Sequence, residues 1–163
     1  MSAIRAADCR DVRVLVAVGF GSGFAPRAPG TAGSIVALAV WWIGLSALTV
    51  PIQAALLVAA TAIGIYCVAA TCRVTGVGDD ERIVVDEWLG MWIALIAAPR
   101  HWAAAAIAFA AFRIFDIWKP WPIGWVDRRV RGALGVVLDD VLAGGLAFAV
   151  LQLSIALGRI GAA

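Results

Sequence analysis

The feature that most constrains this chain is a run of 45 residues, from 28 to 72, that contains no charged side chain. A helix of about 20 apolar residues is long enough to cross the hydrocarbon core of a bilayer. Pro51 divides the run into two segments of about that length, and proline is well tolerated in the first turn of a helix. The run therefore predicts two membrane-spanning helices, over residues 31–48 and 52–72.

The composition supports a membrane protein and argues against other classes. Apolar residues make up 63% of the 163 positions and charged residues 15%, against about 45–50% and about 25% in soluble domains. The formal net charge of +2 and the dispersed basic residues argue against nucleic-acid binding. This length suits one domain, so we expect residues 1–163 to form a single membrane-embedded unit, whose oligomeric state stays open.

The second half of the chain has shorter uncharged runs. Residues 88–99 and 101–112 form two runs of twelve, separated by Arg100, and residues 141–158 form a run of eighteen. The stretch 99–102 suits a tight connection between two antiparallel helices, over 86–98 and 103–118, and a final helix is expected over 136–157. The predicted fold is all-α: an integral membrane helical bundle of about five to six helices with short, interrupted spans.

Basic residues indicate how the chain is oriented in the membrane. Arg27 precedes the first predicted span, Arg73 follows the second, and Arg128, Arg129 and Arg131 precede the last helix. Lys and Arg concentrate in cytoplasmic loops, so this pattern places all three regions on the cytoplasmic side. The charged ends of the 86–98 and 103–118 helices would then meet at that face.

Several acidic residues flank or enter the short helices. An ionisable group in an apolar segment costs at least ~2.5–3.5 kcal/mol on insertion scales, so each needs a partner, water or a function. Carboxylate oxygens with open water positions suit Mg²⁺. The structural alternative is that acids at helix N-termini only interact with the helix macrodipole, and the pattern alone does not choose between the two. The acids are Asp79, Asp86, Glu87, Asp116, Asp139 and Asp140.

Three charged residues are spaced three apart along one face of the predicted 103–118 helix and the residue after it: Arg113, Asp116 and Lys119. This face is either an ion-paired surface or a phosphate site. In a phosphate site, the guanidinium fork of Arg113 would bind two oxygens, and Lys119 would act as a point charge.

A glycine-rich segment over residues 19–34 leads into the first predicted span. The backbone N–H groups of such a loop, and of a helix N-terminus, can bind an anion. This makes Gly21, Ser22, Gly23, Thr31 and Ser34 candidate substrate-binding residues. Glycine also permits close helix crossings, which is the alternative explanation of the segment.

Four blocks of residues together resemble the bacterial phosphatidylglycerophosphatase A family. They occur in the family's order and cover nearly the whole chain, from about Val14 to Ala149. The blocks are residues 19–34, Asp79 with 83–90, residues 112–122 and residues 127–144. The chain departs from the family at Ala133 and Leu134, where a second glycine often follows the first, and in the extra acids Asp80 and Glu81.

This resemblance implies a small, helical, Mg²⁺-dependent phosphatase of the bacterial inner membrane, with its active site at the cytoplasmic face. It would remove the terminal phosphate of phosphatidylglycerophosphate to give phosphatidylglycerol. The motifs place all six acids on the family's acidic positions, and Arg113 and Lys119 on its basic ones. Our hypothesis is that some of Asp86, Glu87, Asp139 and Asp140 hold Mg²⁺, and that Arg113 and Lys119 neutralise the phosphate. Asp79 and Asp116 are the two candidates for the base that takes a proton from the attacking water.

Two other functions stay open. The same site could act on another lipid phosphomonoester, such as phosphatidate or a prenyl phosphate. The chain could also be a non-catalytic lipid-binding or transport protein whose buried charges line a pathway, although it lacks the internal repeat of many transporters.

Overall fold

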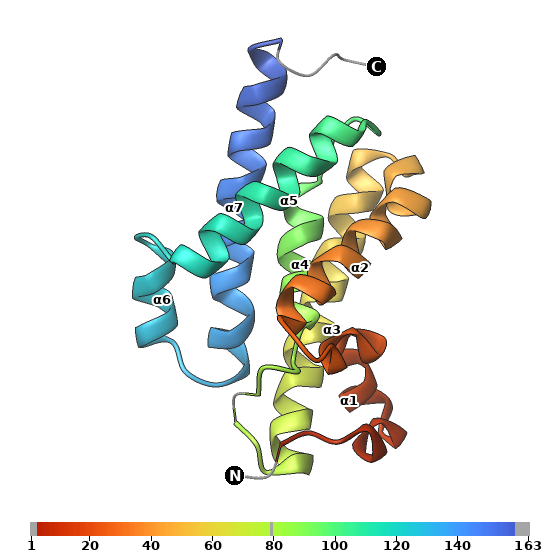
Figure 1. Ribbon diagram of the computed structural model, residues 1–163, viewed down its shortest axis with the longest axis vertical. Helices are drawn as coiled ribbons and strands as arrows, with labels where there is room; N and C mark the ends of the chain where they lie inside the picture. Colours follow the sequence, from red (N-terminus) through yellow and green to blue (C-terminus); the bar gives the residue numbers. More distant parts are fainter. Residues whose placement is uncertain (1–2, 79, 159–163) are drawn as a thin grey trace.

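The computed structural model describes residues 3–78 and 80–158, and this part of the chain is helical without any strand (Figure 1). Three short 3₁₀ segments accompany the α-helices: η1 (Ala6–Arg10), η2 (Gly19–Phe24) and η3 (Leu45–Ala47). The α-helices are α1 (Val12–Ala17), α2 (Pro29–Ile43), α3 (Val50–Thr75), α4 (Val85–Ala94), α5 (Trp102–Trp118), α6 (Ile123–Arg129) and α7 (Ala133–Ala156). The predicted all-α fold is confirmed, and its five predicted helices correspond to α2, α3, α4, α5 and α7.

Three helical stretches are long and apolar enough to cross a membrane: Pro29–Ala47, Val50–Thr75 and Ala133–Ala156. Their outward side chains are apolar and exposed; Ile43, for example, is 82% exposed and Val58 73%. Hydrocarbon covers such a surface without the free-energy cost of apolar hydration, so these helices fit a bilayer. The chain is therefore a membrane protein.

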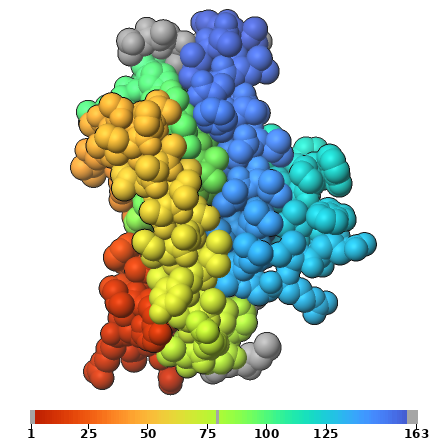
Figure 2. Space-filling view, turned by 180° about the vertical axis from the view of Figure 1, so that it is seen from behind, coloured from red at the N-terminus to blue at the C-terminus, as the bar shows by residue number. Residues whose placement is uncertain are grey.

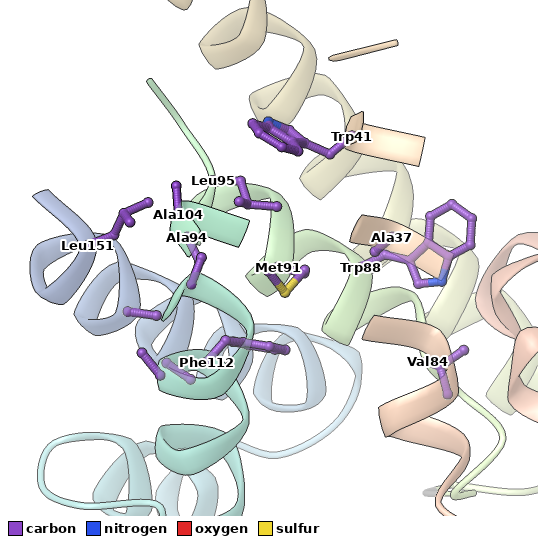
Figure 3. Packing of buried hydrophobic residues seen from close by; sticks show 14 of the residues in the cluster. Ala37, Trp41, Val84, Trp88, Met91, Ala94, Leu95, Ala104, Phe112 and Leu151 are labelled. Carbon is purple, nitrogen blue, oxygen red and sulfur yellow. The ribbon is translucent and has the colours of Figure 1, made fainter. Parts of the chain in front are cut away.

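The short helices α4 and α5 form the interrupted pair that the sequence predicts. They have ten and seventeen residues, and the connection between them contains Pro99. α4 lies inside the bundle, packs most extensively against α7 and also packs against α2. Figure 3 shows Met91 of α4 in this core, with Ala37 of α2 and Leu151 of α7 among the labelled side chains around it.

Two short helices, α1 and α6, lie outside the predicted set. They have six and seven residues, too few for a hydrophobic period to be recognised in the sequence. Tertiary packing holds them, since α1 contacts α3, and α6 contacts α7. In Figure 1, α6 stands at the side of the bundle, next to the lower half of α7.

Candidate active site

A polar cavity of about 820 Å³ lies where the N-terminal ends of α2, α4 and α7 meet the C-terminal end of α5, with α6 as a further wall. Eight carboxylates and four basic side chains line it. The acids are Asp80, Glu81, Asp86, Glu87, Asp116, Asp127, Asp139 and Asp140, and the bases are Arg113, Lys119, Arg128 and Arg131. Seven of the predicted site residues, distant in the sequence, therefore share one cavity.

The crossing of α4 and α7 brings two of these acids together. A side chain at Gly144 would collide with the backbone of Gly90, and one at Gly90 would collide with the ring of Phe112 and lie 2.7 Å from the Asp140 carbonyl oxygen. Asp86 lies one turn before Gly90, and Asp140 lies one turn before Gly144. Because both helices begin at the cavity, this close backbone contact places the two carboxylates at the same level.

Asp86, Glu87 and Asp140 form a compact acidic group. Each offers a carboxylate oxygen, and these oxygens lie within 4.8 Å of one another. Asp86 is 8% exposed and Asp140 4%, while Oε2 of Glu87 is buried and has no hydrogen-bond partner in the described part of the chain. Three converging carboxylates with an unpartnered buried oxygen fit a hard divalent cation.

Burial raises the pKa of Asp86 well above its ordinary value, and the neighbouring charges of Glu87 and Asp140 raise it further. Burial also raises the pKa of Glu87. Desolvation and like charges both oppose ionisation, so the group carries its full negative charge only if a cation compensates it.

Arg113 faces the same cavity from α5. Its Nη1 atom lies 2.6 Å from Oδ2 of Asp116 and donates a weak 3.4 Å hydrogen bond to Oγ of Ser34. Its Nε atom is buried and makes no hydrogen bond to the described residues. A Cβ at Gly30 would collide with Oε1 of Glu87 and lie 3.4 Å from Nη1 of Arg113, so this glycine leaves room for both groups at the start of α2.

Lys119 is ion-paired, which is one of the two arrangements that the sequence left open, but its partners are Asp127 and Asp139. It follows the last residue of α5 in a left-handed conformation, with φ of 46°, and its Nζ atom donates to Asp127 and to Asp139, each at 2.6 Å. Burial opposes its charge, but the hydrogen bonds from Lys119 to these carboxylates raise the pKa of Lys119 above its ordinary value. Asp139 is thus paired with Lys119 and lies outside the compact acidic group, although it adjoins Asp140 in the sequence.

The glycine-rich segment has a packing role in the structure. Ser22 donates to the carbonyl of Gly19 and accepts a 3.3 Å hydrogen bond from Nε1 of Trp88, while Gly23 lies directly against the Arg82 backbone. Gly21, Ser22, Gly23 and Thr31 are absent from the described lining of the cavity. Among the described residues of this segment, Ser34 is the predicted substrate-binding residue that accepts a hydrogen bond from a cavity side chain, Arg113.

Asp79 lies outside the described residues, so the structure gives no account of it. Its neighbour Asp80 accepts hydrogen bonds from the backbone N–H groups of Ile4 and Arg82, both at 2.9 Å. These contacts tie the N-terminal segment to the loop before α4, which is a structural role for Asp80.

Four residues that shape the site had no role assigned to them from the sequence: Gly30, Gly90, Asp127 and Gly144. The spacing of an aspartate four residues before a glycine, which occurs at both Asp86 and Asp140, is a signal that could have predicted the crossing. Asp127 carries no such signal, because its contact with Lys119 depends on how α6 folds back.

The chain is similar in sequence to known proteins. The sequence profile described as phosphatidylglycerophosphatase A matches residues 15–155. The chain belongs to the phosphatidylglycerophosphatase A family. A phosphatidylglycerophosphatase A of Escherichia coli is 43% identical to it over 138 residues, covering 84% of this chain and 80% of the relative.

Two further relatives cover similar shares of the chain. A phosphatidylglycerophosphatase A of Haemophilus influenzae is 42% identical over 130 residues, which cover 79% of this chain and 80% of the relative. A Bacteroides thetaiotaomicron protein with the provisional name phosphatidylinositol-3-phosphatase is 41% identical over 150 residues, covering 86% of this chain and 92% of the relative. No solved structure matches the chain. The three relatives carry two different names, phosphatidylglycerophosphatase A and phosphatidylinositol-3-phosphatase, and each name describes a lipid phosphatase.

Proposed function

We propose that the cavity is the active site of a phosphatase that hydrolyses phosphatidylglycerophosphate to phosphatidylglycerol and phosphate. The observation that carries this proposal is the convergence of three carboxylates, two of them buried and one half-buried, with Arg113 in a polar cavity of a membrane protein. Family membership and the names of the E. coli and H. influenzae relatives support the choice of substrate.

Asp86, Glu87 and Asp140 would hold the cation, and Mg²⁺ is the ion we expect from their all-oxygen donor set. When bound, Mg²⁺ would supply positive charge that neutralises phosphate oxygens and makes the phosphorus more electrophilic. Asp139, a predicted ligand, would reach this group only by exchanging its contact with Lys119.

The chain's own residues would bind and orient the phosphate. Arg113 offers its guanidinium to the cavity, and the N-terminus of α2, at Gly30, presents the positive end of a helix dipole beside it. Lys119 is held by two carboxylates, so it would contribute to phosphate binding only after releasing one of them.

Hydrolysis then requires a water in line with the ester bond. The water oxygen bonds to phosphorus, the bond from phosphorus to the glycerol oxygen breaks, and the glycerol oxygen takes up a proton. Asp116, which lines the cavity beside Arg113, is our candidate for the base that accepts the proton of the water. Asp79, the other predicted base, stays a sequence-based candidate.

The decisive experiment compares Asp86→Asn, Glu87→Gln and Asp140→Asn with the wild type, purified in detergent. We expect phosphate release from phosphatidylglycerophosphate to fall at least about 100-fold in each variant, because each loses a ligand charge. Glu81→Gln is the matched control, since Glu81 lines the cavity but lies outside the acidic group. Normal Mg²⁺-dependent release in all three variants would refute the metal site.

A second substrate deserves a direct test because the B. thetaiotaomicron relative bears a phosphatidylinositol-3-phosphatase name. In a competition assay, phosphatidylglycerophosphate, phosphatidate and phosphatidylinositol 3-phosphate are offered together in mixed micelles. We expect phosphatidylglycerophosphate to be hydrolysed fastest. Failure to release phosphate from any of them, with Mg²⁺ present, would favour a non-catalytic lipid carrier.

We also place the cavity at the cytoplasmic face of the bacterial inner membrane. The C-terminal end of α3 and the segment before α7 lie at the end of the bundle that holds the cavity (Figure 1). The first carries the exposed Arg73 and the second the exposed Arg128, Arg129 and Arg131, and such residues concentrate on the cytoplasmic side.

A further inference from the structure

The segment that joins α5 to α7 carries large apolar side chains on its surface. Trp118 is 75% exposed, Trp121 82% and Trp125 48%. α6 buries Ile123 and Val126, whereas Trp125 of the same helix stays about half-exposed. Figure 2 shows this part of the chain, in cyan and light blue, projecting from one side of the bundle. The fold itself therefore leaves these indole rings uncovered.

Three arginines follow within the same segment. Arg128, Arg129 and Arg131 are exposed, and the guanidinium of Arg129 lies 6.0 Å from the centre of the Trp125 ring. The acid between them and the tryptophans, Asp127, is already bound to Lys119. The surface therefore combines exposed indoles with positive charge, and we call residues 118–131 the Trp/Arg surface.

The position of the Trp/Arg surface relates it to the bilayer. The candidate span α7 starts at Ala133, two residues after Arg131, so the arginines lie at the end of a membrane-crossing segment. The end of a membrane-crossing segment lies at the depth of the lipid headgroups. Tryptophan partitions to the boundary between headgroups and acyl chains, and arginine binds phosphate oxygens in bidentate fashion.

We propose that the Trp/Arg surface is a binding surface for anionic phospholipids of the surrounding leaflet. The tryptophans insert beside the acyl chains, while Arg129 and its neighbours bind the phosphate groups and attract lipids of net negative charge. Positive charge favours these over zwitterionic lipids, and the exposed indoles favour a lipid over a soluble anion.

Two members of the surface, Arg128 and Arg131, also line the cavity. Lipids collected on the Trp/Arg surface thus lie next to the cavity entrance. If the proposed reaction holds, the surface raises the local concentration of its anionic substrate. Lipid binding itself does not depend on that reaction.

The test uses the full chain in nanodiscs of phosphatidylcholine that contain a trace of either dansyl-labelled phosphatidylserine or dansyl-labelled phosphatidylcholine. Energy transfer from tryptophan to dansyl reports which lipid is enriched at the protein. We expect phosphatidylserine to be preferred, and the preference to fall roughly fivefold in Arg129→Gln, the effect of about one basic residue at a membrane surface.

Arg73→Gln is the matched control, because Arg73 is exposed in the last turn of α3, outside the surface, and α3 ends at the same end of the bundle at which α7 begins (Figure 1). It should keep the wild-type preference. An equal loss in both variants, or no preference in the wild type, would overturn the proposal. Thermal unfolding in detergent, compared with the wild type, shows that each variant is folded and does not depend on the proposed reaction.

A second measurement tests the tryptophans. Phosphatidylcholine brominated in its acyl chains quenches tryptophans that contact those chains, and the fluorescence intensity lost per protein molecule should be smaller in Trp121→Leu than in the wild type. The same lost intensity in both proteins would mean that Trp121 faces water or another protein, which would also overturn the proposal.

Discussion

Asp86 and Glu87 are held in the structure where water reaches them poorly and where Asp140 adds a third carboxylate. Burial raises the pKa values of both Asp86 and Glu87 above their ordinary values. A folded state that binds protons more tightly than the unfolded chain loses stability as the pH rises. At neutral pH the acidic group therefore lowers the free energy of unfolding until a cation binds.

This effect of the acidic group predicts how stability depends on pH. Without a divalent cation, the contribution of the acidic group to the free energy of unfolding should be largest below about pH 4, where the unfolded carboxyls are protonated too, and should fall as pH rises toward the raised native pKa values. Mg²⁺ should flatten the dependence because it favours the ionised forms. Thermal unfolding in detergent, with EDTA or with Mg²⁺, measures both effects.

Asp86→Asn is the variant that isolates this effect. The amide oxygen can still accept the 3.1 Å hydrogen bond from the N–H of Glu87, but one buried charge is gone. The variant should have a shallower metal-free pH dependence and a weaker Mg²⁺ effect, while Glu81→Gln should behave like the wild type. A pH dependence in Asp86→Asn as steep as that of the wild type would contradict the explanation.

The crossing of α4 and α7 is the element on which the acidic group depends. Gly144 packs against the backbone of Gly90, which cannot move aside as a flexible side chain could. Because Asp86 and Asp140 each lie one turn from this contact, the separation of the two helices sets the separation of the two carboxylates.

Gly144→Ala should therefore push α4 and α7 apart, with a loss of stability of about 1–3 kcal/mol for overpacking and a drop in Mg²⁺-dependent activity. Gly145→Ala is the matched control on the same helix, since nothing lies within 4 Å of a Cβ at that position. Thermal unfolding and phosphate release are measured on both. Equal behaviour of the two variants would show that the close crossing is unimportant.

At the scale of the whole molecule, the polar cavity lies at one end of the bundle. The cavity lies where α2 begins, and the first span runs from there to Ala47. The arginines at the cavity end predict that this end faces the cytoplasm.

The orientation can be measured with single cysteines in a chain whose three native cysteines have been replaced. Ala47→Cys, at the far end of the first span, should react with a membrane-impermeant maleimide in intact spheroplasts. Glu81→Cys, exposed at the cavity, should react only after permeabilisation. The reverse labelling pattern would place the cavity outside.

The sequence by itself determined that this chain is a helical membrane protein, because the thickness of a bilayer fixes the length of an uncharged segment that can cross it. It also indicated which ionisable residues to follow, since a charge among apolar residues is costly enough to need a reason. The motifs, taken together, indicated the family.

Only the tertiary structure decided which acidic residues join the acidic group and which pair with a basic residue. Asp139 and Asp140 are neighbours, but successive residues on a helix point about 100° apart, so one faces Lys119 and the other faces Asp86. Which of them faces α4 depends on the rotation of α7, and the contact between Gly144 and Gly90 fixes that rotation. Likewise, the glycines at 19–23 could bind an anion or pack closely, and only the structure shows that Gly19 lies against Trp88 and Gly23 against the Arg82 backbone. Contacts between segments far apart in the chain set these outcomes.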